Sequence, residues 1–197
     1  LRLPHPDINL EVGSGSHAVQ TAEVMRRFET VVDEKKPSCV LVVGDVNSTL
    51  ACTLVAVKKG IPVVHVEAGL RSYDRAMPEE INRILTDQVA DLLYTTERSA
   101  ADNLAREGIA SERIRFVGNV MIDSLLSNRE FARKPASCLE ASGIDPALIN
   151  GPQGYGVVTM HRPSNVDHPE VLTSLLNVLR EIADSIPLVF ALHPRTK

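Results

Sequence analysis

Short apolar runs alternate with amphipathic stretches along most of this 197-residue chain. Runs typical of buried strands occur four times, at residues 39–43, 61–66, 91–96 and 114–117. Apolar residues recur at helical spacing elsewhere, which predicts helices over residues 17–35, 50–59, from Pro78, and over 97–108 and 121–131. A shorter apolar segment at residues 8–12 is a possible further strand. Because strands and helices alternate, the pattern predicts an α/β fold with a doubly wound parallel sheet.

The chain changes character after residue 133, where prolines and glycines accumulate. Such a stretch indicates a connection between domains. The alternation then resumes, with predicted elements at residues 155–160, 169–184 and 188–192. We therefore expect an N-terminal domain at 1–133, a connection at 134–154 and the start of a second domain at 155–197. Since the chain opens without Met and stops just past a predicted strand, we expect it to be a piece of a longer protein.

The densest group of charged residues follows the second predicted strand and reads HVEAGLRSYDRAMPEEINR, residues 65–83. In open α/β folds, ligands bind beyond the carboxyl ends of the parallel strands. Asp45 and Glu67 each come just after a predicted strand, Asp45 with one glycine between. Parallel strands place their carboxyl ends on the same edge of the sheet, so we expect these two carboxylates to face one crevice.

The helix that begins at Pro78 is expected to bury its apolar positions, Ile81, Ile84, Leu85 and Val89. Its charged positions are typical of a solvent-exposed ladder, in which Arg83 forms i,i+4 pairs with Glu79 and Asp87. Glu80 fits the same surface interpretation. For Glu79 both a surface role and a role in the site remain open. It follows Glu67 by only twelve positions, so the loop between the two residues must turn back.

Basic residues follow both strands of the second unit at equivalent places, His161 and Arg162 after the first, His193 and Arg195 after the second. For His161 alone, the simpler interpretation is a histidine at a strand end whose hydrogen bonds are satisfied within the protein. The polar residues around it, and the carboxylates at equivalent strand ends of the first unit, favour a function. The Gly/Ser loop 13–16 could hold a phosphate, but it matches neither G-x-G-x-x-G nor the P-loop, and a turn with a helix cap is favoured.

Composition and charge exclude several classes of function. Trp is absent, aromatic residues make up 4% of the chain, and the net charge is −4 with scattered basic residues, which argues against a nucleic-acid partner and gives no reason to expect a membrane surface. The histidines lack the spacing of a metal site, so no metal is expected. Three cysteines without CxxC spacing indicate free thiols, with Cys39 and Cys52 buried, in a reducing, cytoplasmic compartment.

Six motifs carry a resemblance that covers most of the chain. They are GDVNST at 44–49, HVEAGLRS at 65–72, MPEEINR at 77–83, VGNVMID at 117–123, TMHRPSNV at 159–166 and HPRT at 193–196. In this order they resemble the non-hydrolysing UDP-N-acetylglucosamine 2-epimerases. The resemblance implies two Rossmann-like domains of the glycosyltransferase-B type with the active site between them, the second domain being incomplete here. It also implies a homodimer.

The family's reaction interconverts UDP-GlcNAc and UDP-ManNAc. The hydrogen at C2 of the sugar is not acidic, because no carbonyl lies beside C2 in the ring. The reaction therefore proceeds by elimination of UDP to a 2-acetamidoglucal, followed by re-addition after C2 is protonated on the other face. This route requires proton-transferring groups and cationic stabilisation of the leaving diphosphate, and it requires no cofactor.

The resemblance assigns roles residue by residue. Asp45, Glu67, Glu79 and His161 match catalytic positions, the three carboxylates for proton transfer at C2 and orientation of the sugar, His161 for the leaving diphosphate. Arg83, Arg162 and His193 are candidates for binding substrate, although for Arg83 an ion pair with Glu79 is an equal alternative.

Three alternatives remain open at this point. A hydrolysing epimerase releases ManNAc and UDP through the same glycal, a retaining glycosyltransferase of the same architecture needs an acceptor, and a nucleotide-sugar-binding protein carries out no chemistry. The family's basic N-terminal loop and most of its uridine contacts have no counterpart in these 197 residues. We therefore expect the chain alone to lack epimerase activity and to bind UDP weakly.

Overall fold

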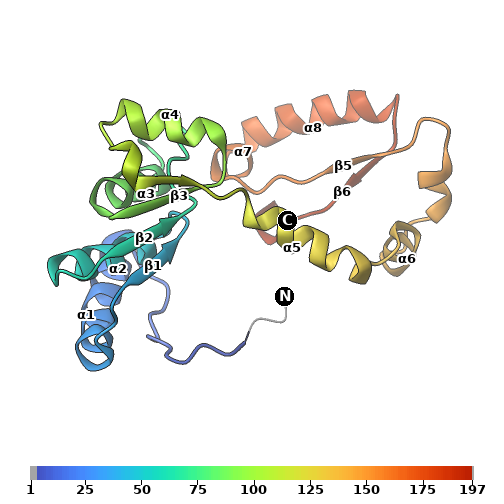
Figure 1. Cartoon of the computed structure of the whole chain (residues 1–197). Coiled ribbons are helices and arrows are strands. Elements are labelled where there is room, and N and C mark those ends of the chain that lie inside the picture. The colour runs from blue at the N-terminus through green and yellow to red at the C-terminus, as the bar shows by residue number, and fades with distance from the viewer. Residues whose placement is uncertain (1–3, 197) are drawn as a thin grey trace. The chain divides into compact units, whose positions relative to one another are not determined.

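The structure, a computed structural model, describes residues 4–196 and divides into two compact units that meet in sequence between Ser127 and Asn128 (Figure 1). Each unit contains a parallel sheet, four-stranded in the first and two-stranded in the second. The predicted alternation of strands and helices is confirmed in both units. None of the helices in the described part of the chain is long and apolar enough to cross a membrane.

The first unit contains four strands in the order β1-β2-β3-β4, each separated from the next by at least one helix. Its elements are α1 (His17–Lys35), β1 (Val40–Val43), α2 (Asn47–Lys58), β2 (Val63–Val66), α3 (Pro78–Val89), β3 (Leu92–Thr95), α4 (Arg98–Arg106), η1 (Ser111–Arg113), β4 (Ile114–Phe116) and α5 (Val120–Asn128). Consecutive strands therefore lie side by side, as is usual where short connections through a helix join parallel strands.

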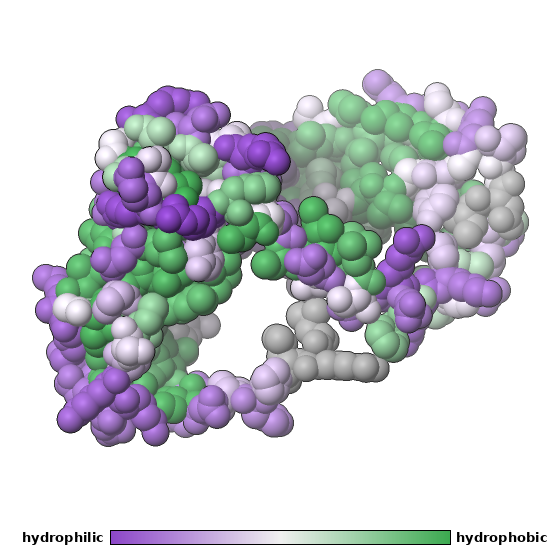
Figure 2. All heavy atoms as spheres, viewed as in Figure 1, coloured by the Kyte–Doolittle hydropathy of each residue, from purple (hydrophilic) through white to green (hydrophobic). Residues whose placement is uncertain are grey.

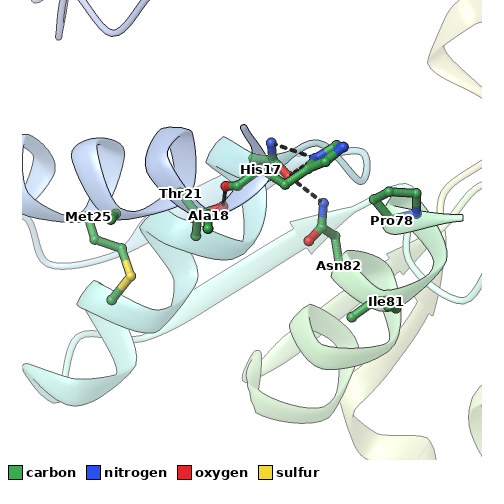
Figure 3. A pocket seen from close by; sticks show the side chains of 9 residues that line it. His17, Ala18, Thr21, Met25, Pro78, Ile81 and Asn82 are labelled. Atoms are coloured by element: carbon green, nitrogen blue, oxygen red, sulfur yellow. Dashed lines mark hydrogen bonds between the residues drawn. The ribbon is translucent and has the colours of Figure 1, made fainter. Parts of the chain in front are cut away.

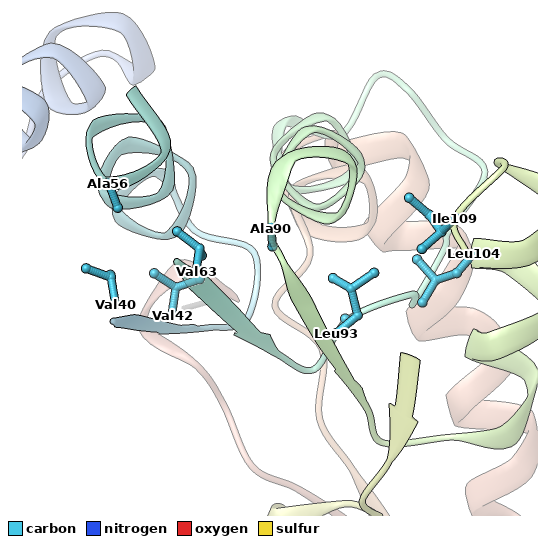
Figure 4. Packing of buried hydrophobic residues seen from close by; sticks show 9 residues of the cluster. Val40, Val42, Ala56, Val63, Ala90, Leu93, Leu104 and Ile109 are labelled. Atoms are coloured by element: carbon cyan, nitrogen blue, oxygen red, sulfur yellow. The ribbon is translucent and has the colours of Figure 1, made fainter. Parts of the chain in front are cut away.

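The core of the first unit lies on one face of its sheet. The register places Val42, His65 and Leu93 side by side on β1, β2 and β3, and all three are buried. Figure 4 shows the apolar side chains of this face together with those contributed by the helices and the loop after α4, namely Val40, Val42, Ala56, Val63, Ala90, Leu93, Leu104 and Ile109. Removal of these side chains from water is the main stabilising contribution, about 1.5–3 kcal/mol for each fully buried Val or Leu.

The opposite face of β1 is open, although its continuous apolar sequence predicts cover on both faces. Leu41 and Val43 are 58% and 53% exposed. Hydrophobic residues accordingly appear over this part of the first unit in Figure 2. Within residues 4–196 that prediction is wrong. Helices α2, α3 and α4 pack beside the buried side chains, and this leaves the other face of β1 exposed.

The expected orientation of α3 is also wrong. Ile81, Leu85 and Val89, predicted to be buried, are exposed. The buried positions of α3 are polar: Glu80, Asn82, Thr86 and Asp87. The reason is that Glu80, Asn82 and Asp87 find hydrogen-bond partners inside the unit, which offsets the cost of removing them from water. The buried Thr86 hydroxyl has no such partner among the described residues.

Two predictions near the N-terminus have different outcomes. Residues 8–12 do not form a strand. Glu11 has φ +53°, outside the extended region, and the carbonyls of Leu10 and Glu11 accept hydrogen bonds from Arg27 instead of from a strand. The loop before α1 serves as a helix cap, since the Ser16 hydroxyl accepts a hydrogen bond from the Val19 amide.

The second unit begins a strand–helix–strand arrangement. Its elements are η2 (Arg129–Phe131), α6 (Pro135–Ala141), η3 (Pro146–Asn150), β5 (Gly156–Val158), α7 (Pro163–Val166), α8 (Pro169–Ala183), β6 (Leu188–Phe190) and η4 (Pro194–Thr196). Strand β5 pairs with β6 in parallel, with Val157 beside Val189. The predicted connection at 134–154 contains two short helices, and the domain boundaries given above remain a prediction.

Candidate active site

Asp45 and Glu67 lie at the same edge of the first unit's sheet. Val43, the last residue of β1, pairs with Val66, the last residue of β2, so the two acidic residues follow adjacent strand ends. A carboxylate oxygen of Glu67 lies 3.4 Å from the place where a Cβ on Gly44 would stand. The side chain of Glu67 therefore lies against the backbone that leads into Asp45.

The backbone at both positions is shaped to turn sharply out of the sheet. Gly44 has φ +73°, and Glu67 has φ +74°, a conformation that non-glycine residues adopt only when their surroundings impose it. The amide of Glu67 donates to the carbonyl of Tyr94 at 3.0 Å, and the amide of Gly44 donates to that of Val66 at 3.1 Å. These bonds across neighbouring strand ends hold the turns in place.

Arg83 links Asp45 to Glu80, a buried acidic residue of α3. One guanidinium nitrogen is in close contact with the Asp45 carboxylate, and another lies 3.1 Å from Glu80. In residues 4–196, the ion pairs of Arg83 are with these two groups, so the expected pairs with Glu79 and Asp87 are wrong. The physical reason is that α3 turns its polar side inward, where Arg83 meets the loop after β1.

Glu80 is buried rather than part of a surface ladder, and 1% of the residue is exposed. Burial by itself raises the pKa of Glu80, but hydrogen bonds from the backbone amides of Ser72 and Tyr73 and the nearby Arg83 outweigh it and hold that pKa below its usual value. Glu80 thus fixes the loop between Glu67 and α3. Glu79, in contrast, lies partly exposed in the first turn of α3.

A pocket of about 410 Å³ lies between α1 and the start of α3 (Figure 3). Apolar side chains make most of its lining, from Ala18, Ala22, Met25, Pro78 and Ile81. Its polar side includes Asn82, whose amide donates to the Asp45 carbonyl at 2.9 Å and to the Asn47 side chain at 3.2 Å. The pocket wall is therefore hydrogen-bonded to the backbone of Asp45.

The sequence pattern does not predict a group of charges that lies behind the two acidic residues, in which the side chains of His65, Asp87 and Arg71 are buried and that of Glu107 is partly exposed. His65 contacts Asp87 at 2.7 Å, Asp87 contacts Arg71 at 2.8 Å, and Arg71 contacts Glu107 at 2.6 Å. Burial disfavours the charged guanidinium, yet Glu107 and Asp87 raise the pKa of Arg71 above its ordinary value. One signal was available: His65 occupies the same face of β2 as Val63, and a polar residue on a buried strand face requires a partner.

The second unit places its predicted residues at the ends of β5 and β6. The rings of His161 and His193 lie 5.3 Å apart, centroid to centroid. Arg162 is exposed and immediately precedes α7. Arg195 is engaged with Asp167 at 2.6 Å, and this bond lowers the pKa of Asp167. The two histidines and Arg162 are thus available to an anionic ligand, whereas Arg195 already has a carboxylate partner.

Residues 4–196 contain no group of three or more His, Cys, Asp and Glu side chains arranged to hold a metal ion. The cysteines are free thiols, but Cys39 is exposed, contrary to the expectation that it is buried, because β1 begins one residue later at Val40. Cys52 is partly buried on α2, and burial raises the pKa of its thiol to about 11.

Several curated relatives match the whole chain, among them the following two. A UDP-N-acetylglucosamine 2-epimerase of Methanococcus maripaludis is 40% identical, and a UDP-2,3-diacetamido-2,3-dideoxy-D-glucuronate 2-epimerase of Pseudomonas aeruginosa is 43% identical. Each match covers 100% of this chain and 53% of the relative. The chain therefore spans about half the length of the curated relatives it matches.

Solved structures agree with these matches. The Methanocaldococcus jannaschii UDP-GlcNAc 2-epimerase, in complex with UDP-GlcNAc and UDP, is 42% identical with a TM-score of 0.81, over 98% of this chain and 52% of that one. The Neisseria meningitidis enzyme bound to UDP-GlcNAc is 28% identical with a TM-score of 0.78, over 98% of this chain and 53% of that one. The α/β fold class of glycosyltransferase-B type is thereby confirmed.

The family model described as UDP-N-acetylglucosamine 2-epimerase matches residues 1–197. The strand-end carboxylates, the paired histidines of the second unit and these similarities have one common explanation. The chain belongs to the UDP-N-acetylglucosamine 2-epimerase family.

Proposed function

We propose that this chain forms part of an isomerase that interconverts UDP-GlcNAc and UDP-ManNAc without hydrolysis. The observation that carries the proposal is the placement of Asp45 and Glu67 at adjacent strand ends, with the Glu67 carboxylate against Gly44. The match of the whole chain to relatives named as 2-epimerases supports it. Because the chain spans about half their length, the activity assays below use a protein completed to that length, called the full-length protein.

The reaction we propose breaks two bonds on one sugar. A base removes the proton at C2, the electron pair of that C–H bond forms the C1=C2 double bond, and the C1–O bond breaks as UDP leaves. The product, 2-acetamidoglucal, is then protonated at C2 on the opposite face while the UDP oxygen returns to C1. Two proton-transferring groups are needed, because one group cannot reach both faces of C2.

Asp45, Glu67 and Glu79 are the groups that we assign to proton transfer and sugar orientation. All three belong to the first unit: Asp45 follows β1, Glu67 follows β2, and Glu79 lies in the first turn of α3. Arg83 binds the Asp45 carboxylate, which orients it. We retain Arg83 as a sugar- or phosphate-binding candidate through that contact.

His161, Arg162 and His193 are the groups that we assign to the diphosphate. The ring contact between the two histidines gathers donors at the ends of two adjacent parallel strands. Cationic and N–H donors stabilise the charge that develops on a departing diphosphate. We assign no cofactor or metal a part in this route.

Product analysis tests the proposal. The full-length protein, given UDP-GlcNAc, is expected to form UDP-ManNAc, identified by NMR, until an equilibrium mixture remains. Asp45→Asn and Glu67→Gln should each lower kcat by roughly 10²–10⁴-fold, the range for loss of one acid–base group. Asp102→Asn, on the exposed side of α4, is the matched control and should leave kcat unchanged.

Other products would identify the alternatives. Free ManNAc with UDP would indicate the hydrolysing reaction, and binding without any product would indicate a nucleotide-sugar-binding protein. Activity on a UDP-2,3-diacetamido uronate but not on UDP-GlcNAc would keep the chemistry and change the substrate, as in the Pseudomonas aeruginosa relative named above. Any of these three results would contradict the proposed substrate or reaction.

We also propose a homodimer. The exposed side of α3, with Ile81, Leu85 and Val89, continues into the largely apolar pocket beside α1. Contiguous apolar surface of this kind marks interfaces. Light scattering of the full-length protein should give twice the mass of one chain. Leu85→Glu should reduce the measured mass to that of one chain, whereas Gln88→Glu, at an exposed polar position on the same helix, should leave it unchanged. A wild-type monomer would contradict the proposal.

The cytoplasm is the compartment we propose for this chain. The cysteines in the described residues are free, which supports a reducing environment.

A further inference from the structure

His65 occupies an unusual position for a residue in a buried strand. It lies in the middle of the sheet on β2, none of it is exposed, and both of its ring nitrogens have partners. Nδ1 is 2.7 Å from Oδ1 of Asp87, and Nε2 is 2.8 Å from the carbonyl oxygen of Gly44. The ring therefore bridges α3 and the turn that leads into Asp45.

Both partners of the ring are hydrogen-bond acceptors. A carbonyl oxygen has no proton to donate, so Nε2 must donate to Gly44. The other oxygen of Asp87 accepts from the Gly69 amide at 3.0 Å and lies 2.8 Å from the Arg71 guanidinium, a cation that favours the ionised form of the carboxylate. Nδ1 must therefore donate as well. A neutral imidazole has a single N–H, whereas a ring that donates from both nitrogens is an imidazolium.

The surrounding charges balance this imidazolium. Asp87 and Glu107 supply two negative charges, and His65 and Arg71 supply two positive ones. A buried charge is tolerated where it is paired and hydrogen-bonded, and each member of this group has at least one ionic partner within 2.8 Å. The arrangement thus accommodates a cation at a site with no access to water.

The same group of charges anchors the two loops that carry the candidate carboxylates. His65 holds the carbonyl of Gly44, one bond from Asp45, and Gly44 is the residue against which Glu67 rests. Through Asp87 it also fixes the amide of Gly69, two residues after Glu67. One buried ion pair therefore restrains both turns.

We propose that His65 is a doubly protonated positioning residue, which sets the separation of the Asp45 and Glu67 carboxylates by holding the Gly44 carbonyl. The inference rests on the proposed function. It adds to that function a residue that does not contact substrate and acts through the backbone of the residues that do. A displacement of about 1 Å at reacting groups can lower a rate by roughly 10²-fold, so such restraint has a measurable effect.

The protonation can be measured without turnover. In the full-length protein labelled with ¹⁵N at histidine, both ring nitrogens of His65 are expected to carry protons at pH 7.5. His65→Gln, which lacks the ring, assigns its resonances. A ring with one unprotonated nitrogen at this pH would overturn the inference.

The positioning role is tested by two variants that each keep one of the two contacts. The amide of Gln can replace the Nε2 donor to Gly44, while the amide of Asn can replace the Nδ1 donor to Asp87. We expect His65→Asn to lower kcat by at least about tenfold with KM changed less than about threefold, and His65→Gln to lower kcat by less. His5→Asn, at an exposed histidine, should leave both constants unchanged.

A purely structural role predicts a different pattern. Both variants would then lose activity in proportion to the fraction unfolded, which circular dichroism at the assay temperature measures separately. Equal kcat values for the two folded variants, or a fully active His65→Asn, would overturn the inference. A wild-type full-length protein that shows no turnover would instead refute the proposed function, and the positioning role with it, while the NMR result would still stand.

Discussion

Gly69 provides the sharpest test of the packing behind Glu67. It has φ +78°, and a Cβ at this position would lie 2.6 Å from the backbone carbonyl of Ala100 and 3.0 Å from a methyl of Leu104. A side chain in the left-handed region costs roughly 1–2 kcal/mol. Overpacking against backbone adds roughly 1–3 kcal/mol. We therefore expect Gly69→Ala to lower the free energy of unfolding by about 2–5 kcal/mol in total.

Gly108 supplies the matched control. Its φ is +82°, and a Cβ there would meet no atom within 4 Å. Gly108→Ala should therefore lower the free energy of unfolding only by the cost of the left-handed conformation, about 1–2 kcal/mol. Urea unfolding of both variants and the wild type, followed by circular dichroism, gives the two differences. Equal losses would refute the close approach of α4 to the loop after Glu67.

Three further predictions concern acid stability, thiol reactivity and the chain alone. The pKa of Glu80 is held below its ordinary value in the folded chain, so the stabilisation it contributes is present above the unfolded-state pKa and is lost as the pH falls through the lower folded-state pKa. Glu80→Gln should therefore reduce the fall of the urea midpoint between about pH 6 and 3, and an unchanged pH dependence, as expected for exposed Glu112→Gln, would contradict this. Because burial raises the pKa of Cys52 to about 11, iodoacetamide at pH 8 should modify exposed Cys39 and Cys138 first, as peptide mass spectrometry would show; equal rates would argue against the burial. Residues 1–197 alone should show no epimerase turnover and weak UDP binding by calorimetry, and turnover by this chain would disprove the prediction.

The sequence predicted the elements of this fold better than their faces. Apolar runs gave the four strands of the first unit, and topology alone placed Asp45 and Glu67 at one edge of the sheet. The orientation of α3 could not be predicted the same way. Its buried residues are polar, and their burial depends on partners distant in sequence, such as Ser72 and Tyr73 for Glu80.

The charges behind the site were hidden for a related reason. His65 and Asp87 are 22 residues apart, and Arg71 and Glu107 are 36 apart. No local period or spacing joins such positions, because the contact exists only after β2, α3 and α4 have packed together. Tertiary hydrogen bonding also overrode the apolar pattern at residues 8–12, where Arg27 binds the backbone that a strand would have used.

The most direct test of the account is solvent isotope incorporation at C2. The full-length protein, incubated with UDP-GlcNAc in D₂O, should yield UDP-ManNAc and recovered UDP-GlcNAc that both carry deuterium at C2, because the proton removed there is replaced from solvent-exchanged carboxyl groups. Asp45→Asn and Glu67→Gln should suppress the incorporation in proportion to their loss of kcat. Epimerisation that leaves the C2 hydrogen in place, or incorporation that persists undiminished in both variants, would contradict the claim that these two carboxylates move the proton.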